Sequence, residues 1–297
     1  MPELPDVTIY VEAIGRRLIG QPLTGYAIRS VFALRSVEPP LDALVGRAVR
    51  DVRRLGKRIV LDFDDDLHLV VHLMIAGRFR WIPVGSRVRV PKRIALAELQ
   101  FATGTLVLTE AGTTRRASIH VVRGADGLAQ FDRGGLEVLE ATRDAFAERL
   151  SRENHTLKRS LTDPRLFSGI GNAFSDEILH RARLSPLKLT SRLTESEATR
   201  LFEATRHTLQ DWTERLRVET GDGFPEKVTA FRPGMAVHGR YREPCPECGT
   251  PVQRIRYRTN ETNYCPRCQT EGRLLADRAL SRLLREDWPR SIDELEG

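Results

Sequence analysis

The stretch CPECGTPVQRIRYRTNETNYCPRC, residues 245–268, contains all four cysteines of the 297-residue chain. It begins and ends with a Cys-x-x-Cys pair, and 16 residues separate the two pairs. This spacing is typical of a structural zinc site, whereas a pair of disulfides or reactive thiols is the alternative interpretation. Because four thiolates would leave no coordination position for water, we expect one Zn²⁺ that holds the fold and does no chemistry. The predicted ligands are Cys245, Cys248, Cys265 and Cys268.

Basic side chains surround this cysteine stretch, and residues 253–257 are predicted to form one arm of a β-hairpin with its tip near residues 259–261. A rigid basic hairpin can press on a phosphate backbone or a groove of DNA. The alternative is a charged loop that only meets solvent. The arginines concerned are Arg240, Arg242, Arg254, Arg256, Arg258 and Arg267.

Upstream of the cysteines, residues 166–172 (LFSGIGN) form a glycine turn that leads into a predicted helix over 173–183. Gly169 and Gly171 permit a tight turn with positive φ. The helix that follows would direct free N–H groups and its positive dipole end outward, which favours a phosphate. Asn172 can cap that helix or donate to the phosphate, and Lys158 can add a charge. Such turns also occur without any ligand, so this one does not by itself define a family.

The spacing of apolar residues divides the chain into a β-rich part and a helical part. A helix over 7–18, with Pro5 at an early helical position, precedes short strands that suggest a β-sandwich. Segment 218–227 has two glycines and a proline and is predicted to be a mobile loop. The fold class is therefore α+β, with domains over 1–135, 136–236 and 237–297. The strands are expected at 59–63, 69–73, 79–82, 99–101, 106–108 and 119–122, and the later helices at 139–150, 157–161, 195–216 and 274–286.

Composition limits the functional classes. The net charge of +7 and pI near 9.6 favour a polyanionic partner, although a merely basic protein fits the charge equally well. No apolar run is long enough to span a bilayer, and the first residues lack the pattern of a signal peptide. We therefore expect a soluble protein of the cytoplasm, without a membrane partner.

The N-terminus, Met1-Pro2-Glu3-Leu4-Pro5, suggests covalent chemistry. A small second residue favours removal of Met1, which would leave Pro2 with a free secondary amine. The positive end of the following helix disfavours the ammonium form, and a neutral amine can attack an electrophilic sugar carbon. The resulting iminium is an electron sink, which suits β-elimination of a phosphate.

Two further side chains can assist this amine. Glu3 is placed for proton transfer, and Lys57 can act as an acid or hold a phosphate. Taken singly, each feature also has an ordinary interpretation: a processing signal at Pro2, a solvated carboxylate at Glu3, and one of 47 basic side chains at Lys57.

Together, these residues resemble the formamidopyrimidine-DNA glycosylase and endonuclease VIII family along nearly the whole chain. The matching segments occur in the family's order, and the cysteine stretch follows them. They are PELPDV at 2–7, Gly56-Lys57, His72-Leu73, SGIGNAFSDEIL at 168–179, and His238-Gly239-Arg240.

The resemblance implies an N-terminal β-sandwich and a helix-two-turn-helix domain, with DNA bound in the cleft between them. It implies that Pro2 is the Schiff-base nucleophile and Glu3 the general acid and base. Lys57 would assist catalysis and hold a phosphate, and Asn172 would bind the backbone beside the lesion. The target nucleotide would be flipped out of the stack.

Several positions depart from the family pattern and indicate a divergent subgroup. Asn260 stands where the finger usually has an arginine, with Arg258 two residues earlier, which puts a second (δ) elimination in doubt. Ile75 replaces a methionine that fills the gap left by the flipped base. In addition, Arg115-Arg116-Ala117 replaces arginine followed by phenylalanine, Lys92 and Arg93 lie near the place of a missing histidine, and Asp6 replaces a glutamate.

Three functions remain open. The first is a monomeric, bacterial, nucleoid-associated glycosylase and abasic-site lyase acting on double-stranded DNA with a damaged base or abasic site. The second is a non-catalytic protein that binds abasic or distorted DNA on the same scaffold. The third, a helix-hairpin-helix or zinc-finger regulator, accounts for the turn or the finger but not for the N-terminus.

Overall fold

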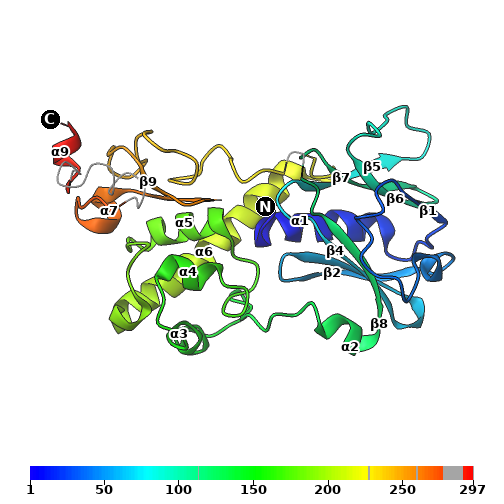
Figure 1. The fold of residues 1–297 in the computed structure, drawn as a ribbon, viewed down its shortest axis with the longest axis horizontal. Coiled ribbons are helices and arrows are strands. Elements are labelled where there is room, and N and C mark those ends of the chain that lie inside the picture. Colours follow the sequence, from blue (N-terminus) through cyan, green and yellow to red (C-terminus); the bar gives the residue numbers. More distant parts are fainter. Residues whose placement is uncertain (113, 227, 259, 277–289, 297) are drawn as a thin grey trace. The chain divides into compact units, whose positions relative to one another are not determined.

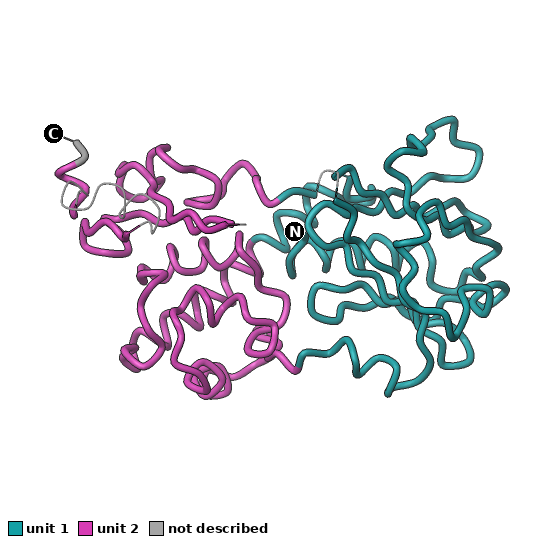
Figure 2. The backbone as a smooth tube through the Cα atoms, viewed as in Figure 1, with its two compact units in different colours: residues 1–133, 212–229 teal, residues 134–211, 230–297 magenta. Residues whose placement is uncertain are grey.

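The computed structural model describes residues 1–297 except 113, 227, 259, 277–289 and 297. The chain forms two compact units (Figure 2). The first comprises residues 1–133 and 212–229, and the second residues 134–211 and 230–297. No helix in the described part of the chain is long and apolar enough to cross a membrane.

The first unit contains two four-stranded antiparallel sheets (Figure 1). One has the order β1 (Gly25–Ile28), β6 (Ala95–Phe101), β7 (Gly104–Glu110), β5 (Gly77–Pro83). The other has the order β2 (Val49–Leu55), β3 (Arg58–Phe63), β4 (Leu67–His72), β8 (Ser118–Arg123). Alternate residues of both sheets join one apolar core, and this confirms the predicted sandwich.

Helix α1 (Leu4–Leu18) packs one apolar face into this core through Val7, Tyr10 and Ile14. Its first turn contains Pro5, where a missing N–H costs nothing. The Asp6 carboxylate accepts from the Glu3 backbone N–H at 2.9 Å, which satisfies a donor at the helix start. The helix thus begins three residues before its predicted start.

Shorter elements complete the first unit. The 3₁₀ turns η1 (Leu41–Leu44) and η2 (Asp64–Asp66) lie between strands, and α2 (Gly124–Ala129) follows β8. Leu128 and Phe131, in and just after α2, cover Val60, Val70 and Val122 on the outer face of the second sheet. This face is therefore only partly exposed to solvent.

The segment after α6 (Glu195–Thr220) is not the free loop predicted over 218–227. The helix continues to Thr220, and the next carbonyls are bound by α1: Arg16 donates to Gly221, and Arg17 to Asp222 and Gly223. The following Phe224 packs against the same core. The described residues of this segment are thus fixed to the first unit.

The second unit is built from helices and a small hairpin. The helices are α3 (Arg143–Ser151), α4 (Leu157–Thr162), α5 (Asn172–Arg181) and the first part of α6, with η3 (Thr190–Arg192) before it. The hairpin joins β9 (Gln253–Arg256) to β10 (Glu261–Tyr264), and α7 (Pro266–Thr270) and α9 (Asp293–Glu296) follow. The rings of Phe146, Phe167 and Phe202 meet in the helical core.

Most of the helix predicted over 274–286 lies outside the described residues. Its flanks pair with the end of α7: Leu274 N–H donates to the Arg290 carbonyl at 2.9 Å, and Ile292 N–H to the Gly272 carbonyl at 2.8 Å. The predicted α+β class, with sandwich, helical part and cysteine finger, is confirmed. A separate domain over 237–297 stays a prediction.

Candidate active site and zinc site

The N-terminal candidates lie in a buried setting at the start of α1. Pro2 is buried, and Glu3 is only 2% exposed. Glu3 immediately precedes the helix, whose free N–H groups give this end a partial positive charge. A carboxylate and the chain terminus are therefore held close together away from bulk water.

The burial and the charges around the chain terminus favour a neutral amine. Burial is the main cause that lowers the pKa of the Met1 amino group; the negative charges of Glu3 and Asp6 raise it, and the positive charges of Arg78 and Lys57 lower it. An amine freed at Pro2 by loss of Met1 would lie one residue along the chain in the same field. The net direction matches what a nucleophilic amine needs, because only the unprotonated form can attack.

Lys57 lies in the turn between β2 and β3, directly after Gly56, whose φ of +62° only glycine adopts readily. Across the sheet, His72 pairs with Arg58 at the same end. Burial, followed by the charges of Arg58 and Lys57, lowers the pKa of His72 to about 4, so the ring is neutral. Its Nδ1 accepts from the Met74 N–H at 2.9 Å.

Ile75 lies in the turn between β4 and β5 and is 61% exposed, which is unusual for a large apolar side chain. The side chain of Arg78 holds this turn in place, because it donates to the carbonyls of Ile75 and Gly77. Gly77 has no room for a side chain: a Cβ there would lie 2.2 Å from the Leu73 carbonyl oxygen. The turn therefore presents an apolar side chain on a rigid support.

Arg115 and Arg116 are exposed, as an interaction with DNA would require. The buried Glu110 carboxylate holds their loop by accepting from the N–H groups of Arg116 at 2.8 Å and Ala117 at 3.0 Å. Ala117 is only 3% exposed and belongs to the sandwich core. It therefore cannot insert between bases, unlike the phenylalanine that the resemblance associates with this position.

The glycine turn differs in detail from the prediction. Gly169 has the expected positive φ of +78°, but Gly171 is extended, with φ −131°, and forms the N-cap of α5. Asn172 is accordingly the first helical residue and does not cap the helix. Its side-chain Nδ2 donates to the Glu261 carbonyl of β10 at 2.9 Å, while its Oδ1 has no hydrogen-bond partner among the described residues.

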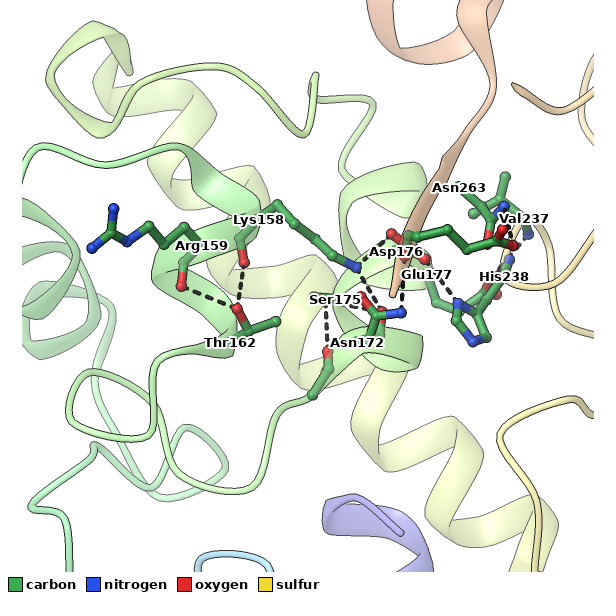
Figure 3. Close-up of polar contacts among 12 residues, drawn as sticks. Lys158, Arg159, Thr162, Asn172, Ser175, Asp176, Glu177, Val237, His238 and Asn263 are labelled. Atoms are coloured by element: carbon green, nitrogen blue, oxygen red, sulfur yellow. Dashed lines mark hydrogen bonds and ion pairs between the residues drawn. The ribbon is translucent and has the colours of Figure 1, made fainter. Parts of the chain in front are cut away.

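Lys158 lies beside this turn, but its charge is already neutralised. The side chain is nearly buried, and Nζ donates to the Asn172 carbonyl and to Asp176 Oδ1, both at 2.6 Å (Figure 3). Lys158 is therefore not the free cation for a phosphate that the sequence suggested. The contacts instead favour a role for Lys158 in holding Asn172.

One face of α5 binds the segment that precedes the hairpin (Figure 3). The second oxygen of Asp176 lies 2.8 Å from His238 Nδ1, and Glu177 accepts from three consecutive backbone N–H groups at 236–238. Four residues further along the helix, His180 Nε2 lies 3.2 Å from Cys245 Sγ. Helix α5 thus positions the glycine turn and the cysteine stretch together.

The four cysteine sulfurs lie within 4.8 Å of one another. Cys248 and Cys265 are separated by 3.4 Å, and Cys245 and Cys268 by 3.9 Å. Four Zn–S bonds of about 2.3 Å at tetrahedral corners would place sulfurs about 3.8 Å apart, whereas a disulfide requires about 2 Å. The set therefore fits one structural Zn²⁺, and the His180 ring can donate to a coordinated thiolate.

At the predicted hairpin tip, the Tyr257 N–H donates to the Asn260 carbonyl at 2.8 Å across the link between β9 and β10. Arg258 and Asn260 are both exposed in it. Arg254, lower on the hairpin, is not free: it pairs with Glu261 at 3.2 Å and lies 4.1 Å from the ring centroid of Tyr241. Arg258 is therefore the more accessible of these two cations.

Comparison with known proteins identifies the architecture. Residues 1–117 match the model of the formamidopyrimidine-DNA glycosylase N-terminal domain, residues 136–220 its H2TH domain, and residues 242–270 the zinc finger found in FPG and IleRS. The formamidopyrimidine-DNA glycosylase of Thermus thermophilus is 32% identical over 285 residues, covering 92% of this chain and all of that protein. The chain belongs to the formamidopyrimidine-DNA glycosylase family. It is thus related to DNA glycosylases of base excision repair.

Other members of the formamidopyrimidine-DNA glycosylase family are also similar to this chain over most of its length. The enzyme of Salinispora arenicola is 32% identical over 295 residues, covering 92% of this chain and 98% of that protein. A crystal structure of Lactococcus lactis Fpg with DNA containing an abasic site has a TM-score of 0.78 at 23% identity, over 90% of this chain and 99% of that one. This second likeness concerns the fold.

Several residues that hold the candidate site residues in place were not predicted from the sequence. Asp176, Glu177 and His180 follow the glycine turn within one helix, and an acidic pair followed by histidine on one face was an available signal. Arg78 gave no such signal, because its partners are backbone carbonyls, and one of them, that of Val228, is distant in sequence.

Proposed function

We propose that this protein is a bifunctional DNA glycosylase and abasic-site lyase whose nucleophile is the amine of Pro2 after loss of Met1. The observation that carries the proposal is the charge environment of the terminus. Burial and two nearby cations lower the pKa of the terminal amine, while a buried carboxylate lies next to it.

The chemistry would proceed in two steps. The lone pair of the Pro2 nitrogen attacks C1′ of the deoxyribose, and the bond from C1′ to the base breaks, with its electrons and a proton passing to the base. The C1′–O4′ bond breaks as O4′ takes a proton, which leaves a cationic iminium. Loss of a proton from C2′ gives an enamine, whose electrons re-form a conjugated iminium as the C3′–O bond breaks and its electron pair leaves with the 3′ phosphate. Water then hydrolyses the iminium and frees Pro2. Glu3 would transfer the protons, and Lys57 would stabilise phosphate charge.

The DNA would be double-stranded and contain a damaged base or an abasic site. Related Lactococcus lactis Fpg structures contain abasic-site DNA and Fapy-dG DNA. Asn172 at the start of α5 would bind the backbone with help from Lys158, and Arg258 and Asn260 would approach it from the finger. Ile75, Arg115 and Arg116 would face the gap left by the flipped nucleotide.

The finger turn bears on how far the reaction goes. Its exposed side chains are Arg258 and Asn260, and no arginine occupies position 260. We expect β-elimination as the main outcome and little δ-elimination.

Borohydride trapping tests the mechanism. Duplexes with an abasic site, formamidopyrimidine, 8-oxoguanine or thymine glycol are incubated with protein and sodium borohydride, and covalent complexes are resolved on a denaturing gel. Wild-type protein should be trapped, whereas Pro2→Gly and a protein with an uncleavable N-terminal extension should not. Glu3→Gln should still be trapped on abasic DNA but not on a duplex with an intact damaged base.

The second candidate, a non-catalytic binder of abasic DNA, predicts the opposite pattern. It is supported if wild-type protein binds the abasic duplex tightly, is never trapped, and binds equally well after Pro2→Gly. That outcome would refute the lyase mechanism.

A further inference from the structure

The outer face of the second sheet of the first unit differs in charge between its two ends. On β3 this face presents Arg58, Val60 and Asp62 in alternation. The cross-strand register extends the pattern over β4 and β8. One end of the face is therefore defined by Asp62 and the other by Arg58.

The Asp62 end is balanced. Asp62 accepts from Arg53 at 2.6 Å and lies 2.6 Å from His68 Nδ1. A second carboxylate, Asp66, lies 3.2 Å from the same histidine. Arg53 and His68 thus have carboxylate partners here, so no further anion is needed.

The Arg58 end is not balanced. Arg58, His72 and Ser118 lie in register across β3, β4 and β8, and His120 follows Ser118 on the same face. Exposed Arg35 lies beside them: its backbone N–H donates to the Ile119 carbonyl of β8 at 2.8 Å, and its side-chain charge acts on His120.

Among the described residues, no carboxylate forms an ion pair with these groups or with neighbouring Arg133. In the described part of the chain, the side-chain contacts of the Arg58 guanidinium are with the Phe131 carbonyl, at 3.2 Å, and with the Phe131 ring. Burial and the charge of Arg133 lower the Arg58 pKa, and burial followed by Arg58 and Arg35 lowers that of His120. These groups repel one another, and a bound anion would relieve the repulsion.

We propose that Arg58, Ser118, His120 and Arg35 form a second phosphate site, which holds a DNA backbone phosphodiester distinct from the one assigned to Lys57. The proposal rests on the proposed function for the presence of DNA. Lys57 immediately precedes Arg58, so the two sites adjoin at one end of the sheet. Two arginines supply charge, while a hydroxyl and a neutral imidazole can donate hydrogen bonds.

The salt dependence of DNA binding measures this contact. The full chain is titrated onto a duplex containing a tetrahydrofuran abasic analogue at several KCl concentrations. Each lost phosphate contact should lower the slope of log K against log salt by about 0.9. Arg35→Ala and Arg58→Gln should each do so, which means that the advantage of wild-type protein shrinks about 3.5-fold when salt rises fourfold.

Arg50→Ala is the matched control. It also removes one exposed arginine from the first unit, but Arg50 is paired with Asp64 at 2.5 Å. Its slope should equal that of wild-type protein. Thermal melting checks that Arg58→Gln remains folded, and Arg35→Ala provides an independent test because Arg35 is exposed. Wild-type slopes for both Arg35→Ala and Arg58→Gln would overturn the proposal.

A methylphosphonate scan locates the phosphate. Single phosphates of the duplex are neutralised in turn, and one position outside those flanking the lesion should weaken binding by wild-type protein but not by Arg35→Ala. If the loss of affinity caused by the methylphosphonate and the loss caused by Arg35→Ala add at every position, the proposed site is refuted. Trapping on the same duplex separates the two ideas: failure of wild-type trapping would reject the lyase without altering the slopes.

Discussion

Replacing Asp176 by asparagine should strongly destabilise the second unit while preserving the size of the side chain. The Asp176 side chain is fully buried, and its two oxygens bind Lys158 at 2.6 Å and His238 at 2.8 Å. Asparagine keeps one oxygen that can accept from Lys158 but removes the negative charge that compensates its nearly buried ammonium. Removing one partner of a buried pair costs about 3–5 kcal/mol, because the other charge stays desolvated.

For a unit of this size, that cost corresponds to a fall in Tm of roughly 6–20 °C. Thermal and urea unfolding measure it. Glu148→Gln is the control, since Glu148 pairs with Arg152 on the exposed surface of α3, and such pairs contribute at most about 1 kcal/mol. The double variant Lys158→Met, Asp176→Asn should be at least about 1 kcal/mol more stable than the two single losses added together.

Two results would contradict this reasoning. One is an Asp176→Asn protein within about 1 kcal/mol of wild type, as expected for Glu148→Gln. The other is strict additivity in the double variant, since residues in one buried network should be coupled.

Three further predictions follow from the site. Removing Zn²⁺ with a chelator should release one equivalent of metal and abolish binding to abasic DNA, and fluorescence anisotropy before and after zinc is restored checks this. Ile75→Ala should change the free energy of unfolding by less than about 0.5 kcal/mol but slow base excision in single-turnover assays, and an unchanged rate would remove Ile75 from the flipping machinery. The pKa of His72 falls from 6.5 to about 4 on folding, so its stabilising contribution is present above pH 6.5 and lost as pH falls. Urea unfolding should therefore show about 2 kcal/mol less stability from this residue at about pH 5 than at about pH 8, and His72→Gln should remove that difference.

The parts of the fold that the sequence predicted well have short-range causes. The cysteine pairs fix the finger by spacing, and the hairpin around Gly104 follows from a turn between two alternating runs. Strand β2, VRDVRRL, was missed because its outer face bears charged side chains, so its pattern does not look like a half-buried strand.

The site residues likewise divide into those that short-range sequence determines and those that depend on distant residues. Cys245 and its three companions were identifiable because ligand chemistry dictates residue type and spacing. Whether Lys158 is free or paired depends on Asp176, 18 residues away, and on the turn that brings them together. Likewise, the burial of Ala117 follows from its place in the sandwich, which local sequence does not specify.

Part of the core of the first unit comes from a segment that lies late in the sequence. Val228 and Phe224 pack with residues of the sandwich, although the sandwich strands end at Arg123. On the ribosome, this core can close only after the segment through residue 229 has been synthesised, roughly 10–45 s after the N-terminus at 5–20 residues per second. During that interval the first unit is incomplete, and a processing enzyme can act on Met1 of the nascent chain. The order of synthesis thus leaves time for the proposed nucleophile to be uncovered before the first unit is complete.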